Sequence, residues 1–260
     1  MGLKLKISVV IANYNSGKYI DQCISSLKSQ TYKDIEIIFF DDNSTDNSLE
    51  VIQKYSDVKI IKNKKQTNFG SINQLNAFKN AINLSSGNLI FFLDSDDYFH
   101  EKKVETVVDY FKNDFSKKIS FDLPIIVQNS FQKKESGKKT FFKTYWPYIH
   151  PTSCITIRKE IVDELFASIS FDSFTDVWMD LRVNIFAQYI LKSLDIINEN
   201  LTYYRKTDTN ISSKFKKFSK TWWKRRRQAH EYFYKFSKDN NLSFKKNFDF
   251  LITKLICKIL

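Results

Sequence analysis

Three sets of acidic, amide and aromatic side chains follow apolar runs in the first hundred residues of the chain. The sets are Asn13-Tyr14-Asn15, Asp41-Asp42-Asn43-Ser44 and Asp94-Ser95-Asp96-Asp97. Each apolar run is typical of a buried strand, and open parallel sheets bind ligands beyond the carboxyl ends of their strands. We therefore expect the three sets to meet at one edge of a sheet and to form a ligand site.

The third set places three carboxylates within four residues. Carboxylates this close repel one another, and a hard divalent cation would relieve that repulsion while binding phosphate oxygens. The alternative is a solvated acidic turn that caps a helix, and a cation explains the cluster better. The chain has no G-x-G-x-x-G sequence and no Walker loop to cradle a diphosphate with backbone amides. The pattern predicts a site for Mn²⁺ or Mg²⁺.

Other candidate residues are open to two interpretations each. The run Asp41–Asp46 is typical of an Asx turn that caps a helix, but an aspartate at a strand end can also accept hydrogen bonds from a nucleobase or a ribose. Tyr14 could stack on a base or lie in the core. His150 could touch a ligand or serve the structure alone.

Strand-like and helix-like segments alternate around these sets. Apolar runs predict strands over 7–12, 35–41, 58–62 and 89–93, and helical periodicity predicts helices over 18–30, 44–55, 72–84 and 101–112. Further on, the pattern indicates β-structure within 121–158 and a helix near Asp176. This alternation predicts an α/β fold with a mostly parallel sheet sandwiched by helices.

Composition limits the partners and the compartment. The chain carries 41 basic and 29 acidic residues, and its net charge of +12 favours an anionic partner. No run approaches the ~20 apolar residues of a membrane span, and we find no signal peptide. The three cysteines are far apart, which fits a reducing compartment. We expect a cytoplasmic protein.

Taken in order, these motifs resemble glycosyltransferase family two, which has the A-type nucleotide-sugar fold. The resemblance rests on residues 8–15, 41–46 and 91–97, with Asn68-Phe69-Gly70 and Lys79-Asn80 where the family has N-x-G and A-R-N. It implies inverting transfer of a sugar from a nucleotide diphosphate sugar, UDP-linked by our prediction, to a hydroxyl of a glycan or lipid-linked acceptor. Synthesis of surface polysaccharide or lipooligosaccharide is the expected setting.

The resemblance also implies roles for single residues. The residues expected to bind the nucleotide sugar are Ala12, Tyr14, Asp42, Lys79 and Asp94. Lys79 stands where the family usually has Arg, which keeps a cation for phosphate but loses the bidentate fork. Asp96 would be the chief metal ligand of the D-x-D motif.

A later segment, residues 173–182, resembles the E-D-x-x-x-x-x-R segment of the family. Asp176 then matches the expected general base, with Thr175 in place of the usual Glu. Residues 203–212 resemble the closing loop of the family, with Thr207 in place of its His. Asp208 could supply a metal ligand there or belong to a surface turn.

The last fifty-five residues differ from the rest in composition. We predict a catalytic region over 1–205, with a nucleotide-sugar half (1–100) and an acceptor half (101–205), and a basic, aromatic helical extension over 206–260. One helical face carries Phe215, Phe218, Trp222, Ala229, Phe233 and Phe236. This pattern fits a helix that docks residues 214–260 on an anionic membrane surface, at the inner face of the cell membrane, and equally one that packs on the catalytic region.

Two other functions remain open. A metal-dependent nucleotidyltransferase also uses strand-end carboxylates, but it normally has a basic, glycine-rich loop near its N-terminus, and residues 13–18 are poor in that respect. A nucleic-acid-binding protein would explain the basic extension but not the three acidic strand ends, so we regard nucleic acid as an unlikely partner.

Overall fold

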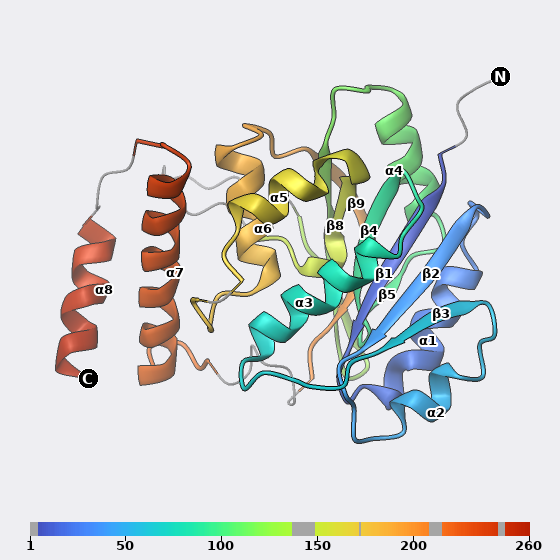
Figure 1. Ribbon diagram of the computed structural model, residues 1–260, viewed down its shortest axis with the longest axis horizontal. Coiled ribbons are helices and arrows are strands. Elements are labelled where there is room, and N and C mark those ends of the chain that lie inside the picture. The colour runs from blue at the N-terminus through green and yellow to red at the C-terminus, as the bar shows by residue number, and fades with distance from the viewer. Residues whose placement is uncertain (1–4, 137–148, 172, 208–214, 244–247) are drawn as a thin grey trace.

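A computed structural model describes residues 5–136, 149–171, 173–207, 215–243 and 248–260 (Figure 1). Its strands are β1 (Ile7–Asn13), β2 (Ile35–Asp41), β3 (Val58–Lys62), β4 (Leu89–Asp94), β5 (Tyr98–Phe99), β6 (Ile119–Gln128), β7 (Phe131–Lys134), β8 (Ile155–Arg158) and β9 (Ile196–Arg205). Its α-helices are α1 (Gly17–Lys28), α2 (Ser48–Ile52), α3 (Gly70–Asn83), α4 (Lys103–Lys112), α5 (Val162–Ser168), α6 (Met179–Tyr189), α7 (Lys220–Asp239) and α8 (Phe248–Ile259).

In the described part of the chain, the nine strands form one sheet in the order β3-β2-β1-β4-β8-β6-β9-β5, with β7 on the edge of β6. Strands β1 to β4 are mutually parallel, whereas β8 runs antiparallel to both β4 and β6. The register places Ala12 opposite Asp94 and Asn13 opposite Asp41, so the predicted polar strand ends do meet at one edge. The predicted α/β fold with a sheet between helices is confirmed, and the sheet is mixed, because β8 and β7 run antiparallel to their neighbours.

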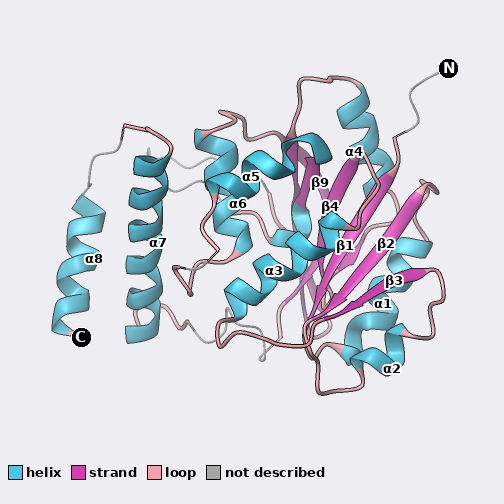
Figure 2. Ribbon diagram, viewed as in Figure 1, coloured by secondary structure: helices cyan, strands magenta, loops and turns pink. Residues whose placement is uncertain are grey.

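Helices cover both faces of the sheet (Figure 2). Side chains of a strand point alternately to opposite faces, so Val9 and Val10 belong to different cores. One core lies under α1, α2 and α4, and the other lies under α3, α5, α6 and α7. Because β1 lies between β2 and β4 and is covered on both faces, its apolar residues are buried without alternation.

The predicted helix over 44–55 is shorter in the structure, where α2 begins only at Ser48. Asn43 has a left-handed backbone with φ of 55°. The Asp46 carboxylate accepts hydrogen bonds from the backbone N–H groups of Gly17 and Ser48, each at 2.9 Å. Residues 44–47 therefore form the capped turn that precedes the helix.

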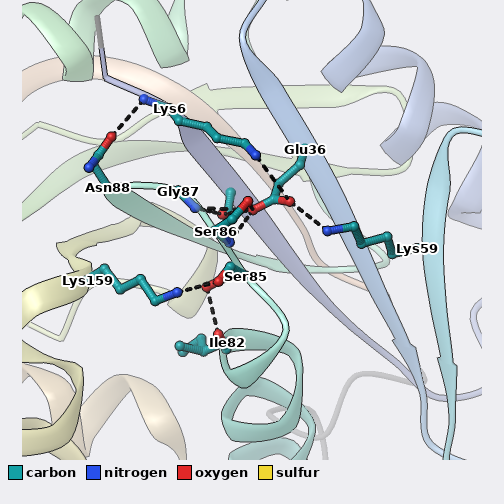
Figure 3. A network of polar contacts seen from close by, with 10 residues as sticks. Lys6, Glu36, Lys59, Ile82, Ser85, Ser86, Gly87, Asn88 and Lys159 are labelled. Atoms are coloured by element: carbon teal, nitrogen blue, oxygen red, sulfur yellow. Dashed lines mark hydrogen bonds and ion pairs between the residues drawn. The ribbon is translucent and has the colours of Figure 1, made fainter. Parts of the chain in front are cut away.

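The amino ends of the parallel strands are joined by Glu36 (Figure 3). Its carboxylate accepts hydrogen bonds from the Ser8 hydroxyl, the Ser86 hydroxyl and the Gly87 backbone N–H, and it pairs with Lys59 at 2.9 Å. Burial raises the pKa of the Glu36 carboxyl, but the hydrogen bonds from Ser8, Lys59 and Ser86 outweigh burial and lower that pKa to about 2. This cluster lies at the end of the sheet opposite the polar strand ends.

The two C-terminal helices lie side by side, with α7 next to α5 and α6 and with α8 outermost (Figure 1). Tyr232, Phe233 and Phe236 of α7 are buried in the core that α3 and α6 share. The predicted aromatic face is shorter in the structure, because Phe218 lies before the first residue of α7 and is 63% exposed, while Phe233 and Phe236 are buried. None of the helices in the described residues is long and apolar enough to cross a membrane.

Candidate active site

The loops after β1 and β2 hold each other through amide and hydroxyl groups. Asn13 Nδ2 donates to Asp41 Oδ1 at 2.8 Å, and Asn15 Oδ1 accepts from the Thr45 backbone N–H at 2.7 Å. A Cβ at Gly17 would lie 2.1 Å from Asn47 Oδ1, so only glycine allows the loops to approach this closely. The Asp41 carboxylate therefore holds the loop after β1 against the loop after β2.

Asp42, the neighbouring carboxylate, faces a different set of partners. It is buried and accepts hydrogen bonds from Asn63 Nδ2 at 2.6 Å and Gln66 Nε2 at 3.0 Å. These amides belong to the segment that leads from β3 into α3. Tyr14, in contrast, is 52% exposed beyond the end of β1, while Ala12 is partly buried opposite Asp94.

The acidic cluster after β4 divides into two kinds of carboxylate. Asp97 is buried and accepts hydrogen bonds from Ser153 Oγ at 2.6 Å and from the Arg205 backbone N–H at 2.8 Å. The Arg205 side chain also donates to the Asp96 backbone carbonyl at 2.7 Å. Asp97 thus ties the turn to β9, whereas Asp94 and Asp96 remain partly exposed.

Burial is the main cause of raised pKa values throughout this cluster. Burial and then the charge of Asp96 raise the pKa of Asp94 to about 7. Burial also raises the pKa of Asp96, and burial together with the charges of Asp96 and Asp94 raises the pKa of Asp97. The raised pKa values mean that the three carboxyl groups do not all ionise easily. A bound cation would stabilise their negative charge.

Among the described residues, no group of three or more His, Cys, Asp or Glu side chains forms a complete metal site. A different mode of binding suits Mg²⁺, which is commonly held by one or two carboxylates, with substrate phosphates and water completing its shell. The partly exposed pair Asp94 and Asp96 fits that donor set.

Gln74 of α3 connects the acidic cluster to the segment before α6. Its Nε2 donates to Asp94 Oδ1 at 2.9 Å, and its Oε1 accepts from the Met179 backbone N–H at 3.4 Å. Lys79 is exposed farther along the same helix, and its ammonium lies 4.8 Å from the centre of the Phe171 ring. The contact from α3 to Asp94 is therefore made by Gln74, and a phosphate-binding role for Lys79 stays a prediction.

Arg182 organises the segment that carries Asp176. It is fully buried, and its guanidinium donates to the backbone carbonyls of Ser170, Ser173, Phe174 and Val177. A hydrogen bond from the Ser71 hydroxyl to the Thr175 carbonyl, at 2.6 Å, ties the same segment to α3. These bonds explain physically why an arginine stands six residues after Asp176.

Asp176 itself is partly buried and contacts the C-terminal extension. Gln228 of α7 donates from Nε2 to Asp176 Oδ2 at 2.8 Å and accepts from the Asp176 backbone N–H at 2.9 Å. Asp180 lies nearby at the start of α6, and burial raises the pKa of its carboxyl. The charge of Asp180 contributes in turn to the raised pKa of Asp94, so the two carboxylates face one region.

The two remaining candidates have different outcomes. His150 is buried, packs 5.0 Å from the ring of Phe121 and contacts the Asp122 carbonyl at 3.2 Å, and burial lowers its pKa to about 4. These contacts are those of a structural histidine. Asp208 lies outside the described residues.

The sequence motifs do not identify four side chains that contact the carboxylates of the site. They are Gln66, Gln74, Ser153 and Gln228. Each donates a hydrogen bond to one of the carboxylates discussed above, and each comes from a different element or loop. Only the three-dimensional arrangement brings them to the strand ends, although the helical periodicity of α3 and α7 could have indicated which residues share a face with the core.

Residues 8–175 match the family model for glycosyl transferase family 2. An uncharacterised glycosyltransferase of Nostoc sp. is 32% identical over 215 residues, which make up 77% of this chain and 65% of that protein. The chain therefore spans about two thirds of the length of this relative.

Two solved structures share the fold. A TarS fragment of S. aureus, residues 1–349 in complex with UDP-GlcNAc, has a TM-score of 0.65 at 17% identity, over 97% of this chain and 70% of that one. The mannosyltransferase PcManGT of Pyrobaculum calidifontis, in complex with GDP-Man and Mn²⁺, has a TM-score of 0.61 at 12% identity, over 99% of this chain and 70% of that one. The family model covers more than half of the chain, and the residues that match its motifs meet at one edge of the sheet, so the chain belongs to glycosyltransferase family 2.

Proposed function

We propose that this chain transfers a sugar, with inversion at the anomeric carbon, from a UDP-linked sugar to a hydroxyl of a glycan or lipid-linked acceptor in the synthesis of a surface glycan. The single observation that carries the proposal is the connection through Gln74. This side chain bonds Asp94 of the acidic cluster and the Met179 backbone N–H three residues after Asp176. A donor site and a candidate base are thereby held on one framework.

The donor's nucleoside would lie at the ends of β1 and β2. Asp42 would accept a hydrogen bond from the base or the ribose, and the exposed ring of Tyr14 would cover the base. The backbone at Ala12 runs beside Asp94, which would line the ribose side of the pocket. UDP-GlcNAc in the TarS complex supports a uridine nucleotide.

A divalent cation, Mn²⁺ or Mg²⁺, would be held by Asp96 and Asp94 and by the donor's diphosphate. Bound there, it would neutralise charge that develops on the leaving diphosphate. The Mn²⁺ of the PcManGT complex supports this proposal. Lys79 is proposed as a further cation for the diphosphate, which would require its side chain to leave the Phe171 ring.

The Asp176 carboxylate would take the proton from the acceptor hydroxyl as that oxygen attacks the anomeric carbon. The base must be ionised and within hydrogen-bond reach of the hydroxyl. The hydrogen bond from Gln228 orients the Asp176 carboxylate, and the bonds that Arg182 makes to the preceding carbonyls hold the segment in place. The acceptor oxygen would attack one face of the anomeric carbon, and the nucleoside diphosphate would leave from the opposite face.

The enzyme would work at an anionic membrane surface through α8 and the basic residues before it. Phe248, Leu251, Leu255 and Ile259 form one exposed stripe on α8, each at least 53% exposed. Lys254 and Lys258 are exposed beside the stripe. An apolar stripe flanked by lysines has the character of an interfacial helix that binds anionic headgroups.

Two variants test the reaction. Asp176→Asn keeps the shape of the base but cannot take a proton, so donor binding should survive while turnover falls at least ~100-fold. Asp96→Ala should abolish metal-dependent binding of UDP, as measured by calorimetry with Mn²⁺. Near-normal turnover of Asp176→Asn would contradict the role of Asp176 as the base, and Asp180 would then be the next candidate. Unchanged UDP affinity of Asp96→Ala would contradict the role of Asp96 as a metal ligand.

A further inference from the structure

Helix α7 lies between the outer helix α8 and the segment that carries Asp176 (Figure 1). Three of its side chains, Arg225, Gln228 and Tyr232, are spaced three and four residues apart and therefore share one face. All three interact with residues 174–182, which form the loop before α6 and its first turn. The extension thus faces the proposed base along two turns of helix.

Gln228 makes the most direct of these contacts. Its amide holds Asp176 at two points, because the oxygen accepts from the backbone N–H at 2.9 Å and the nitrogen donates to carboxylate Oδ2 at 2.8 Å. These two bonds fix both the main chain of Asp176 and the orientation of its carboxylate.

The neighbouring contacts keep α7 in register with this segment. The Arg182 guanidinium lies 4.8 Å from the centre of the Tyr232 ring, and Phe174 meets the same ring edge-on at 5.6 Å. Arg225 lies close enough to Asp180 that its charge opposes the effect of burial on that carboxyl. Gln228 is therefore presented to Asp176 by a helix that is fixed on both sides.

We infer that Gln228 is a positioning residue for the base of the transfer reaction, and that α7 is by this contact a part of the active site. The inference rests on the proposed function, because it takes Asp176 as the base. The family model matches residues 8–175, so α7 lies outside the matched region. On this inference α7 nevertheless contributes a residue to the active site.

The test replaces Gln228 by methionine, which has similar length and shape but cannot form either hydrogen bond. For Gln228→Met, kcat should fall about 10- to 100-fold with the donor KM unchanged, as expected for a misplaced base. Gln228→Glu keeps an acceptor for the Asp176 backbone N–H but replaces the donor to the carboxylate, so kcat should fall for this variant as well. Lys238→Gln, an exposed position on the same helix, is the matched control.

A second measurement does not depend on activity. Thermal unfolding of Gln228→Met, Asp176→Ala and the double variant forms a cycle, in which bonded residues should show less than additive destabilisation. Additive effects, or a Gln228→Met enzyme with the kcat of the unchanged chain, would overturn the inference. If the unchanged chain transfers no sugar from any donor while the cycle still shows coupling, the proposed function is wrong and the contact itself stands.

Discussion

At the scale of single residues, the partners of each carboxylate decide what it does. Asp41 and Asp97 have the same side chain as Asp42 and Asp94, yet Asp41 binds the neighbouring loop and Asp97 binds Ser153 and β9. Asp94 and Asp96 are left facing solvent in part. Carboxylates that stand side by side in the sequence therefore differ in burial and in hydrogen-bond partners, and these differences appear only in the structure.

Ser153 illustrates how the turn after β4 is supported from behind. Its hydroxyl accepts from the Asp94 backbone N–H at 3.0 Å and donates to Asp97. Its carbonyl accepts from the buried ammonium of Lys103, which also forms an ion pair with Asp122 at 2.7 Å. The proposed metal ligands are thus fixed by a buried polar network that reaches α4 and β6.

We predict that Gln74 sets the affinity of the cation site. Gln74→Leu removes the donor to Asp94 Oδ1 but keeps the volume of the side chain. Loss of such a partner of a metal ligand usually weakens metal binding about 10- to 100-fold. Calorimetry of UDP with and without Mn²⁺ should show that loss only when metal is present. Asn83→Ala, exposed at the end of the same helix, should bind as the unchanged chain does, and equal affinity for Gln74→Leu would refute the prediction.

At the scale of elements, periodicity identified the segments whose burial is regular. The predicted strands over 35–41 and 58–62 agree with β2 and β3, because these runs are apolar and flanked by polar residues. The predicted helix near Asp176 instead begins at Met179. The local reason is Arg182, whose bonds to the carbonyls of Ser173 and Val177 hold residues 173–177 in an irregular path.

Strand β9 shows why other elements escape sequence analysis. It pairs with both β6 and β5 and carries Arg205 to Asp97 at its end, but its sequence mixes Asn, Glu and Thr with apolar residues. Its buried positions, such as Leu201 and Thr202, depend on partners far away in the chain. Pairing between distant strands leaves no periodic signal in either of them.

We predict that Glu36 makes the fold sensitive to acid. Its pKa of about 2 lies below the ordinary value of 4.5, so the unfolded chain takes up this proton first. The stabilisation by Glu36 is therefore complete above pH 4.5 and is lost as pH falls towards 2. Glu36→Gln should lower the free energy of unfolding by about 2 kcal/mol at neutral pH and by less in acid.

Chemical denaturation between pH 2.5 and 7 measures this difference. Glu160→Gln is the matched control, because Glu160 pairs with Lys118 at the surface and is 56% exposed. An exposed ion pair contributes about 1 kcal/mol or less, so this variant should change little. A constant difference between Glu36→Gln and the unchanged chain across the whole pH range would contradict the prediction.

At the scale of the whole molecule, the extension belongs to two environments. Helix α7 contributes Phe233 and Phe236 to a core of the catalytic region, whereas α8 packs on α7 and turns its own apolar stripe outwards. The predicted boundary at residue 205 coincides with the end of β9, but burial continues across it. The sequence predicted a helical extension after residue 205, but it could not say which of its apolar faces would find a partner.

We predict that α8 attaches the protein to anionic membranes. The stripe on α8 offers apolar side chains at the spacing of one helical face. Exposed lysines on the two C-terminal helices, including Lys220, Lys224, Lys254 and Lys258, add positive charge to this part of the chain. Each basic residue near an anionic surface contributes about 1 kcal/mol, so binding should be strong at low salt and weaken as salt is added.

Leu251→Glu with Leu255→Glu should abolish co-sedimentation with vesicles that contain phosphatidylglycerol and leave the fold intact, because both side chains are more than half exposed. Leu84→Glu, equally exposed but remote in the chain, serves as the control. If the unchanged protein does not sediment with these vesicles at low salt, and instead forms a dimer that the α8 substitutions dissociate, the stripe meets a second copy of the chain and the membrane prediction is wrong.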